Sequence, residues 1–430
     1  YNFKEIIDFL MEDDDYKHKI EILKDKLNYK KETENIKDYT SFLYESGNVS
    51  ISKLENFMRC PFSYFINYGL RAKEREVYDF SPADYGTYCH KIFDDFFKGV
   101  YENNIDWNTI DREFIQREVE KLTAKMAEKS NFILESSPKY KYFSSITHEN
   151  IVESIEIMAE QVRRGNFIPT GFETEFGDES IKPISYTLKN GKDIKLVGKI
   201  DRIDVFKGEN SDFLRIIDYK SSKRDIDLNQ VYAGLQLQLF VYMNAILSSN
   251  KDRYKPAGLF YSDFTTNLVG FETYSKMLDM TDDSFYSEKL KKNKLTGFVI
   301  KDMELLKNLD KTLEENRLTS EILPIKLKSK GQEIGAGTLG LTTDEFEIVN
   351  EFVLNKTKDI CEEIYDGNID IKPFRYKDKK PCDYCKYKSI CRFDVKHNKY
   401  NNIKNLATKD KPNEVFEKME LKNKEKRGEK

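Results

Sequence analysis

Two strand-like segments that carry acidic residues constrain the fold of this chain more than any other feature. The segment DIKLVGKIDRIDVF spans residues 193–206, and the segment DFLRIIDYKSS spans residues 212–222. The polar break KGENSD at 207–212 is typical of a hairpin connection. We therefore expect two neighbouring antiparallel strands inside a sheet, each with an apolar body and an ionisable side chain.

The segments around this hairpin predict an α/β fold. Strand patterns recur at residues 172–177, 182–188 and 257–264. Helical patterns occupy residues 84–103, much of 108–165, about 227–247, and 343–366. A helix, an antiparallel meander, a crossover helix and a further strand, in this order, give a mixed sheet flanked by helices.

The same patterns divide the chain into three parts. We expect residues 1–49 to form a helical segment that either ends a preceding domain or serves as a linker, residues 50–395 to form the main domain, and residues 396–430 to be a charged, partly disordered tail. The Lys-rich residues 270–340 have no clear periodicity. The sequence does not begin with Met, and we expect it to be a fragment of a longer protein.

Composition narrows the class of protein. No run of about 18 apolar residues is present, so we expect no membrane span. The net charge of −4, from 71 basic and 75 acidic residues, argues against a uniformly basic surface but allows a local basic groove for nucleic acid. Six cysteines, three of them close together, suit a reducing cytoplasm better than a disulfide framework.

The acids in the two hairpin strands predict a metal site. Strand alternation puts Asp201 on one face of the first strand and Asp204 on the other, and it puts Asp218 and Lys220 on one face of the second strand. Neighbouring carboxylates repel unless a cation lies between them. We predict a divalent metal ion held by Asp201 and Asp218, with Lys220 beside the bound water. The alternative is a pair of ordinary solvated acids, but their apolar neighbours make uncompensated carboxylates costly.

Single residues elsewhere in the sequence are weaker candidates for a functional role. His90 ends the stretch GTYCH on a helix, and imidazole can bind Mg²⁺ or Mn²⁺ beside carboxylates, although a lone His is more often a surface or core residue. Gln238 and Tyr242 share a helix face, which by itself indicates packing. Ser52 and Glu55 have the spacing of a capping box at the start of their own helix.

A cysteine cluster near the end of the chain predicts a second metal site. Its spacing is C-x2-C-x5-C, and a thiolate site for zinc or an iron–sulfur cluster normally has four ligands. Cys361 is favoured as the fourth ligand by its proximity in the sequence, but it can also pack as a small hydrophobe. Cys89 adjoins His90 and would belong to that site, while Cys60 precedes Pro61 at a helix end. Spacing alone leaves the fourth ligand and the metal open. The three clustered residues are Cys382, Cys385 and Cys391.

Four motifs in order resemble those of the RecB-family nucleases, which have the PD-(D/E)xK, restriction-endonuclease-like fold. They are GTYCH ending at His90, GKID ending at Asp201, DYK at 218–220 and QLFVY at 238–242. Lys199 within GKID departs from the family, in which an apolar residue is more usual there.

This resemblance implies roles for the motif residues. The catalytic metal, Mg²⁺ or Mn²⁺, would be bound by His90, Asp201, Asp218 and the backbone carbonyl of Tyr219. Lys220 would orient or activate the attacking water and stabilise charge on the phosphate. The resemblance also implies that Gln238 and Tyr242 support the site and contact the DNA strand.

The cysteines extend the resemblance to one group of these nucleases. One cysteine before the nuclease motifs, in RCPFSYFINYGL, and C-x2-C-x5-C after them look like the iron–sulfur staple of AddB subunits of bacterial AddAB helicase–nucleases. The likeness covers about residues 50–395. It implies a [4Fe–4S] cluster, with zinc as the rival metal, held by Cys60, Cys382, Cys385 and Cys391.

The AddB resemblance also implies a function and partners. An exonuclease domain would act on a single DNA strand fed from a duplex end by an AddA-like helicase–nuclease subunit during double-strand-break repair. No P-loop is present in the sequence, so unwinding would depend on another part of the complex. A CRISPR-adaptation-type iron–sulfur exonuclease and a catalytically inert DNA-binding scaffold are the alternatives.

Overall fold

A computed structural model describes most of the chain, and these residues form two compact units. Unit 1 comprises Tyr1–Glu45, Asn56–Lys73 and Glu363–Ile403, and unit 2 comprises Ser46–Glu55, Glu74–Glu362 and Lys404–Lys430. The boundaries expected at 49/50 and 395/396 do not coincide with the boundaries of these units. The described residues are 3–28, 35–73, 80–129, 137–177, 181–250, 253–264, 282–313, 317–328, 333–407 and 413–429.

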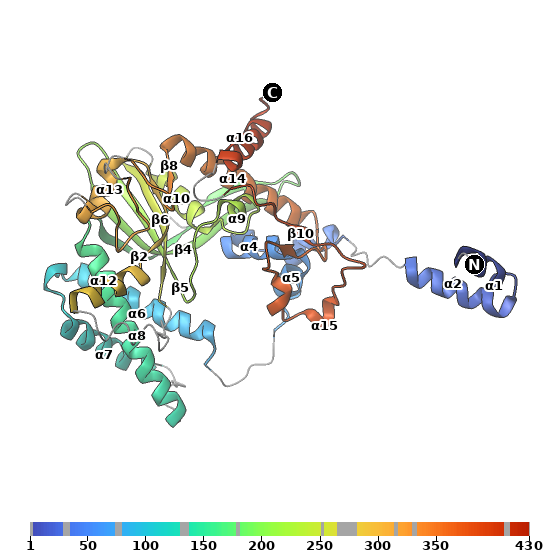
Figure 1. The fold of residues 1–430 in the computed structure, drawn as a ribbon, viewed down its shortest axis with the longest axis horizontal. Coiled ribbons are helices and arrows are strands. Elements are labelled where there is room, and N and C mark those ends of the chain that lie inside the picture. The colour runs from blue at the N-terminus through green and yellow to red at the C-terminus, as the bar shows by residue number, and fades with distance from the viewer. Residues whose placement is uncertain are drawn as a thin grey trace. The chain divides into compact units, whose positions relative to one another are not determined.

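Unit 2 contains the mixed sheet that the sequence predicts, with strand order β1-β4-β5-β6-β7-β8 and with β2 and β3 also paired to β4 (Figure 1). The pairs β4–β5 and β6–β7 are antiparallel, whereas β5–β6 and β7–β8 are parallel. The predicted hairpin and the α/β class are therefore confirmed. The strands are β1 (Asn48–Ser50), β2 (Ile168–Phe176), β3 (Ile184–Thr187), β4 (Asp193–Lys207), β5 (Asp212–Lys220), β6 (Tyr254–Asp263), β7 (Thr296–Ile300) and β8 (Leu339–Leu341).

Strand β4 organises the sheet because it is long enough to pair with different partners along its length. Its first half pairs with β3 and β1, and its second half pairs with β2 and β5. Burial of Ile194, Leu196 and Ile200 holds this strand in the core. The second half therefore presents its polar side chains within a sheet that is covered by helices.

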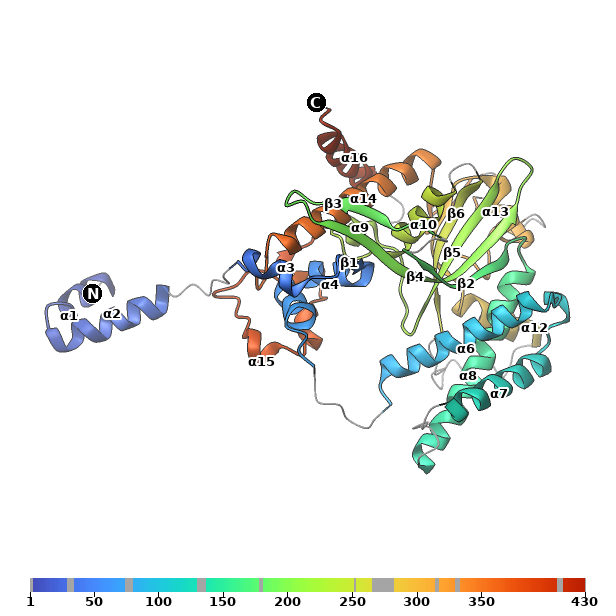
Figure 2. The ribbon, with the colours of Figure 1, turned by 180° about the vertical axis from the view of Figure 1, so that it is seen from behind.

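Helices cover both faces of the sheet in unit 2 (Figures 1 and 2). Helix α6 packs against β2 and β4, with α7 and α8 beside it, and helix α10 packs against β5 and β6. The buried face of α6 includes Phe93 and Phe97, and that of α10 includes Phe240 and Met243. The helices and helical turns of unit 2 are α6 (Pro82–Glu102), η3 (Trp107–Thr109), α7 (Arg112–Lys129), α8 (Pro138–Arg163), α9 (Leu228–Tyr232), α10 (Gln238–Ser249), α12 (Asp282–Lys292), α13 (Met303–Leu309), η5 (Lys311–Leu313) and α16 (Asn413–Arg427).

The single helix expected at about 227–247 is in fact two helices, α9 and α10. The chain turns between them at Gly234, which has a φ of +81° that side chains with a Cβ rarely adopt. Gln236 stabilises the turn, since its side chain accepts from the Asp227 N–H at 2.9 Å and donates to the Asp225 carbonyl at 3.0 Å. The turn sets where α10 begins.

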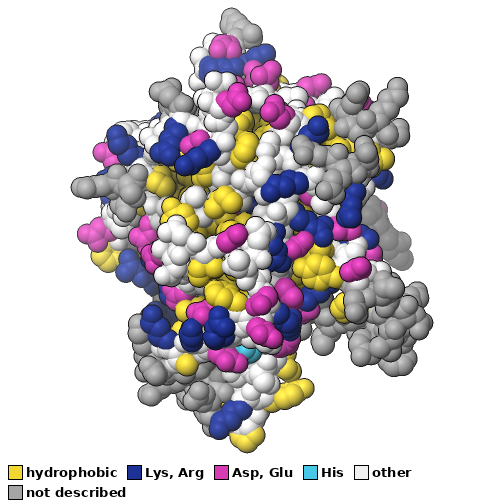
Figure 3. Space-filling model, turned by 90° about the vertical axis from the view of Figure 1, so that its left-hand side faces the viewer, with side chains coloured by type: hydrophobic (Ala, Val, Ile, Leu, Met, Phe, Trp, Pro, Cys, Tyr) yellow, Lys and Arg dark blue, Asp and Glu magenta, His cyan; other side chains and the backbone are white. Residues whose placement is uncertain are grey.

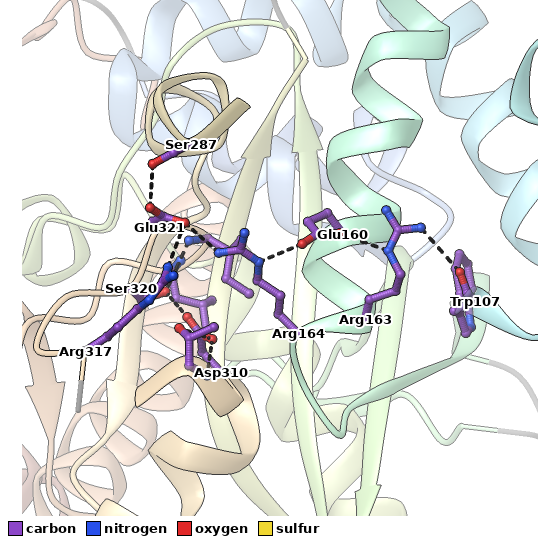
Figure 4. A network of polar contacts seen from close by, with 12 residues as sticks. Trp107, Glu160, Arg163, Arg164, Ser287, Asp310, Arg317, Ser320 and Glu321 are labelled. Atoms are coloured by element: carbon purple, nitrogen blue, oxygen red, sulfur yellow. Dashed lines mark hydrogen bonds and ion pairs between the residues drawn. The ribbon is translucent and has the colours of Figure 1, made fainter. Parts of the chain in front are cut away.

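The segment with no clear periodicity contributes regular structure to unit 2. Its described residues include α12, α13 and the two strands β7 and β8, which extend the sheet beyond β6. A polar network joins this segment to the end of α8 (Figure 4). Arg164 donates to Glu160 and to Glu321, both at 2.7 Å, and Ser287 also donates to Glu321. The described part of this segment therefore packs with α8 and extends the mixed sheet.

Unit 1 has a small aromatic core. Tyr64 packs edge-on against Phe57, with ring centroids 5.5 Å apart, and Tyr44 lies 5.6 Å from Tyr64 and 6.0 Å from Tyr365. As expected, the helix before Cys60 ends there and a new helix starts at Pro61. The elements are α1 (Phe3–Leu10), α2 (Asp14–Asn28), η1 (Lys37–Tyr39), α3 (Thr40–Leu43), α5 (Pro61–Tyr64), η2 (Phe65–Gly69), β9 (Phe374–Arg375), η6 (Pro381–Tyr384), α15 (Lys388–Cys391) and β10 (Asn401–Asn402). Two helices run across the division into units, α4 (Ile51–Arg59) and α14 (Thr343–Tyr365).

The tail after residue 395 is more ordered than the sequence indicates. Helix α16 buries Val415, Phe416 and Met419, and the Asn423 side chain donates to the Ile348 carbonyl at 3.0 Å. The expectation of disorder is therefore wrong for Asn413–Arg427. The apolar positions of this helix are sparse, and the favourable energy comes from the tertiary contacts rather than from helix propensity.

The lack of long apolar runs and the small net charge each have a counterpart in the structure. None of the helices among the described residues is long and apolar enough to cross a membrane. On the face drawn in Figure 3, Lys and Arg side chains are interspersed with Asp and Glu side chains, as the small net charge leads one to expect.

Candidate active site

The strand ends of β4 and β5 bring the two predicted metal-binding acids together. In the register of this hairpin Arg202 lies opposite Ile217, so the next positions, Asp201 and Asp218, also face each other. The Tyr219 N–H donates to Asp201 Oδ2 at 2.8 Å, which holds this carboxylate against the neighbouring strand. Tyr219 thus takes part in the site through its backbone, while its carbonyl remains a predicted metal ligand.

Helix α6 adds His90 to this pair. Its Nδ1 lies 3.4 Å from Asp201 Oδ2, and its ring packs edge-on against Tyr219 and Phe264, each with centroids 5.7 Å away. Burial lowers the pKa of His90, but the hydrogen bond to Asp201 and the charges of Asp201 and Asp218 outweigh burial and raise it. An imidazole in this position is oriented by aromatic packing and electrostatically coupled to both acids.

Lys220 links the acids to helix α10. Its ammonium forms an ion pair with Asp218 Oδ2 and donates to Gln238 Oε1 at 3.4 Å. The Gln238 amide in turn donates to the Tyr242 hydroxyl at 2.8 Å. The six side chains that the sequence singles out for this site thus form one connected group: His90, Asp201, Asp218, Lys220, Gln238 and Tyr242.

Asp218 is the member of the group whose ionised form is disfavoured by its surroundings. Burial, followed by the charge of Asp201, raises its pKa from 3.8 to about 6, against the opposing effects of Lys220 and His90. Beyond the ion pair with Lys220, its Oδ2 has no hydrogen-bond partner of good geometry among the described residues. A buried carboxylate in this state is stabilised by any additional cation.

This donor set suits a divalent metal ion in its chemistry. Carboxylate oxygens are the ligands that Mg²⁺ and Mn²⁺ prefer in proteins, and burial together with the charge of Asp201 raises the pKa of Asp218, so an added cation would stabilise its ionised form. However, no three His, Cys, Asp or Glu side chains in the described ranges are close enough to hold a metal ion as they stand. In the structure the cation beside Asp218 is the Lys220 ammonium.

The back of the same two strands is held by a buried charge cluster. Arg202 donates two hydrogen bonds to Asp204, both at 2.7 Å, and Arg215 donates one at 2.8 Å. All three side chains are fully buried. The Arg202 guanidinium lies over the ring of Phe97, and the Arg215 guanidinium lies over the ring of Phe167. This cluster ties β4 to β5 directly beneath the acids of the site.

The structure also brings four cysteines together in unit 1. Cys60 has its pKa raised to about 11, first by burial and also by the charges of Cys391 and Cys382, while the Ser63 and Phe62 amides oppose the rise. Burial also raises the pKa of Cys382, and the charges of Cys385 and Cys391 raise it further. The Tyr387 N–H donates to Cys385 Sγ at 3.4 Å, and such amide–sulfur bonds favour thiolates.

The remaining cysteines lie elsewhere. Cys361 belongs to unit 2, where it is fully buried on α14 near Tyr186, and burial raises its pKa to about 12. Cys89 is fully buried on α6 next to Tyr85. The proximity of Cys361 in the sequence was therefore a misleading criterion, because Cys60 is the cysteine that lies near Cys391 and Cys382. Whether these four hold a cluster stays a prediction, since the described thiols do not form a closed metal site.

Two residues that were not predicted from the sequence to belong to the site, Glu55 and Arg224, lie close to Gln238 and Lys220. The carboxylate of Glu55 does not cap its own helix, so that expectation is wrong. Instead its Oε1 accepts from the Leu237 and Gln238 N–H groups at 2.7 and 3.1 Å, and its Oε2 lies 3.6 Å from Arg224. Nothing in the local pattern around residue 55 indicates a partner almost two hundred positions away.

A family model described as the PD-(D/E)XK nuclease superfamily matches residues 48–392, a range that contains all of these site residues. The chain belongs to the PD-(D/E)XK nuclease superfamily. This membership confirms the predicted fold class and the resemblance from which it was drawn, and a divalent metal ion at the acids agrees with it.

Curated relatives show which kind of nuclease this chain is similar to. The chain is 37% identical over 85% of its length to the B-type subunit of an ATP-dependent helicase/deoxyribonuclease from Clostridioides difficile (strain 630), and covers 32% of that protein. Proteins of the same name from Caldanaerobacter subterraneus and Thermoanaerobacter sp. (strain X514) are 37% and 40% identical over 84% and 83% of the chain, which covers 31% of each. The chain spans about a third of the length of these relatives. They agree with the AddB resemblance and do not favour the CRISPR-adaptation alternative.

Proposed function

We propose that this chain is the metal-dependent nuclease domain of an AddAB-type helicase–nuclease and hydrolyses the phosphodiester bonds of single-stranded DNA as an exonuclease. The observation that carries the proposal is the group of His90, Asp201, Asp218 and Lys220 at one end of β4 and β5. Two carboxylates, an imidazole and an ammonium group are the side chains that metal-assisted phosphodiester hydrolysis needs.

In this proposal His90, Asp201 and Asp218 hold Mg²⁺ or Mn²⁺, with the Tyr219 carbonyl as a further ligand. The bound ion supplies Lewis-acid chemistry, which acidifies a water molecule and stabilises negative charge on the phosphate. The Asp201 carboxylate is oriented for this by the Tyr219 N–H, and the edge-on packing of His90 fixes its ring. Ligands held by such contacts lose little freedom on binding a metal ion.

Lys220 acts on the water and the phosphate. Its ammonium lies beside Asp218, one of the residues that would hold the ion, and Gln238 on α10 accepts a hydrogen bond from it at 3.4 Å. Burial raises the pKa of Tyr242, so this hydroxyl stays protonated and can donate a hydrogen bond to the DNA strand.

The proposed partners are inferred from the names of the relatives and not from the geometry of the site. Because the relatives are named as subunits of an ATP-dependent helicase/deoxyribonuclease, we propose an AddA-like subunit as partner and a single strand unwound from a duplex end as substrate, in double-strand-break repair. None of the six cysteines, all of which lie in the described ranges, forms a disulfide, and this supports action in the reducing cytoplasm.

We propose further that Cys60, Cys382, Cys385 and Cys391 bind a [4Fe–4S] cluster. Two observations support this. After burial, the charges of Cys391 and Cys382 raise the pKa of Cys60, and those of Cys385 and Cys391 raise the pKa of Cys382, so these thiols lie near one another; the Tyr387 N–H donates to Cys385 Sγ. Such a cluster would join Cys60 to residues more than three hundred positions later, and closing so long a loop restricts the unfolded chain and stabilises the folded one.

The test is cleavage of end-labelled single-stranded DNA by the 430-residue chain with Mg²⁺ or Mn²⁺. Asp218→Ala should abolish cleavage while the circular dichroism spectrum and iron content stay unchanged. Asp212→Ala, at the opposite end of β5, is the matched control and should cleave normally. Cleavage retained in Asp218→Ala would refute the assignment. Binding of DNA in EDTA, with no cleavage by the unaltered chain in either metal, would instead indicate an inert scaffold.

A further inference from the structure

A second cationic side chain lies next to the candidate active site without a role in the function proposed above. Arg224 follows Lys220 by four residues, and the two side chains are 24% and 23% exposed. Both contact the ring of Tyr261, with the Arg224 guanidinium carbon 5.2 Å and the Lys220 Nζ 5.8 Å from its centroid. One buried aromatic ring therefore positions two partly exposed cations.

The loop that carries Arg224 is firmly held. Thr296 on β7 donates its hydroxyl to the Arg224 carbonyl. One residue later the Gln236 side chain donates to the Asp225 carbonyl at 3.0 Å, and it accepts from the Asp227 N–H at 2.9 Å. The guanidinium is therefore presented from a fixed backbone, and little ordering is required when it binds an anion.

Glu55 contacts both Arg224 and the start of helix α10. Its side chain is 5% exposed, and Oε1 accepts the N–H groups of Leu237 and Gln238 while Oε2 faces Arg224 at 3.6 Å. The N-cap residue of α10, Leu237, makes no side-chain cap of its own, so Glu55 supplies the cap from a distant segment. The position of Gln238, and through it that of Lys220, depends on this carboxylate.

The pairing of Arg224 with Glu55 is loose. A separation of 3.6 Å through one guanidinium nitrogen is longer than the 2.7–2.8 Å of the buried Arg202 and Arg215 pairs in the same unit. An arginine has five N–H donors in a planar fork that matches a phosphate, so one such contact leaves donors for a second anion. Because the side chain is partly exposed beside Lys220, a DNA phosphate is the anion that would reach it.

We propose that Arg224 binds a backbone phosphate of the DNA strand adjacent to the one being cleaved, and that Glu55 is a positioning residue that holds Arg224 and the start of α10 in register. This inference rests on the proposed function and deepens it by assigning a strand-binding residue to the same site. Lys220 then acts at the reacting phosphate and Arg224 keeps the neighbouring phosphate in place.

The first test is binding of a fluorescent single-stranded oligonucleotide, measured by anisotropy in EDTA at several salt concentrations. Arg224→Ala should weaken binding about fivefold or more and reduce the slope of log Kd against log salt by about 0.7, the loss of one phosphate contact on a single strand. Arg224→Lys should restore the slope but not the full affinity, because a lysine cannot form the bidentate contact. Arg253→Ala is the matched control, since Arg253 pairs with Asp212 at the opposite end of β5.

An unchanged affinity and salt slope in Arg224→Ala would overturn the assignment. A result in which Arg253→Ala has the same effect would also overturn it, because the contact would then be non-specific. Both readouts are taken without metal and do not require cleavage. They therefore stay informative even if the unaltered chain fails to cut DNA, a result that would contradict the proposed nuclease function alone.

The second test separates positioning by Glu55 from simple stabilisation. Glu55→Ala should lower kcat about tenfold or more, since the cap of α10 holds Gln238 against Lys220, and should raise KM by less than Arg224→Ala does, since Arg224 is misplaced but still present. Glu55→Gln keeps an acceptor for the two N–H groups and should recover most of kcat. A lowered melting temperature with kcat and KM both unchanged would mean that Glu55 is only structural. If Glu55→Ala does not fold, failure of Glu55→Gln to retain kcat would contradict the capping role.

Discussion

Replacing Asp218 by Asn should stabilise the metal-free chain at pH 8, even though it removes the candidate metal ligand. Burial and the charge of Asp201 raise the pKa of Asp218 from 3.8 to about 6. A difference of this size means that the ionised carboxylate destabilises the fold by ~3 kcal/mol relative to the protonated form. Asn has nearly the same shape and no charge, and it keeps the position filled. The opposing effect of Lys220 is already contained in this shift, and the gain is reduced only by contacts that an amide cannot reproduce, so we expect a net increase of ~1–3 kcal/mol in the free energy of unfolding.

The sign of the pH dependence follows from the direction of the shift. A pKa that is higher in the folded than in the unfolded chain means that the folded chain binds more protons between pH 3.8 and about 6. The stability that protonated Asp218 contributes is therefore fully present below pH 3.8 and is lost as the pH rises through about 6. The advantage of Asp218→Asn should be large at pH 8 and small near pH 4.

The assay is chemical unfolding, followed by circular dichroism in EDTA at pH 4.5 and pH 8, values that bracket the pKa of about 6. Mg²⁺ at pH 8 should stabilise the unaltered chain but not Asp218→Asn, because the metal neutralises the same carboxylate. Asp212→Asn, at the other end of β5, serves as the control. A variant less stable than the unaltered chain at pH 8 in EDTA, or a difference that does not vary with pH, would refute this electrostatic description.

Three further predictions address the rest of the site. Lys220→Gln should lower kcat by about a hundredfold or more with DNA affinity largely kept, because the charge acts on the reacting phosphate; an equal loss in affinity and kcat would contradict this. Cys385→Ala should abolish the brown colour of anoxically purified protein and lower its melting temperature, whereas Cys361→Ala should keep the colour; a colourless unaltered protein that contains zinc would exclude the iron–sulfur cluster. Asp204→Asn should cost about 3–5 kcal/mol in unfolding free energy, because it leaves two buried guanidinium groups without their carboxylate; a cost below about 1 kcal/mol would show that water reaches them.

The sheet and the acids could be predicted because their signals are local. Alternation along residues 193–207 and 212–220 places Asp201 and Lys220 on defined strand faces, and the short polar turn makes the two strands neighbours. These constraints act within a few residues, so the order of residues is sufficient to state them. The same holds for α6, where the apolar face determines which side of the helix is buried.

Other features could not be predicted because they depend on segments that are distant along the chain. The strands β7 and β8 are short, and they become strands where β6 offers hydrogen-bonding groups to β7 and β7 offers them to β8. Helix α16 has few apolar positions and is stabilised by contacts with α9 and α14. In both cases the local pattern is weak and tertiary pairing decides the outcome.

By itself, the sequence determined the α/β class, the hairpin of β4 and β5, and the residue types that suit metal-assisted hydrolysis. Spacing along the chain left the choice between Cys60 and Cys361 open, the family resemblance favoured Cys60, and the tertiary structure places Cys60 close to Cys391 and Cys382. Only the tertiary structure decided that Glu55 caps α10 rather than its own helix. The physical reason is that a thiol or a carboxylate binds whatever donor or charge lies within a few ångströms of it. Spacing along the chain determines such neighbours inside one helix or strand, whereas between elements they are determined by packing.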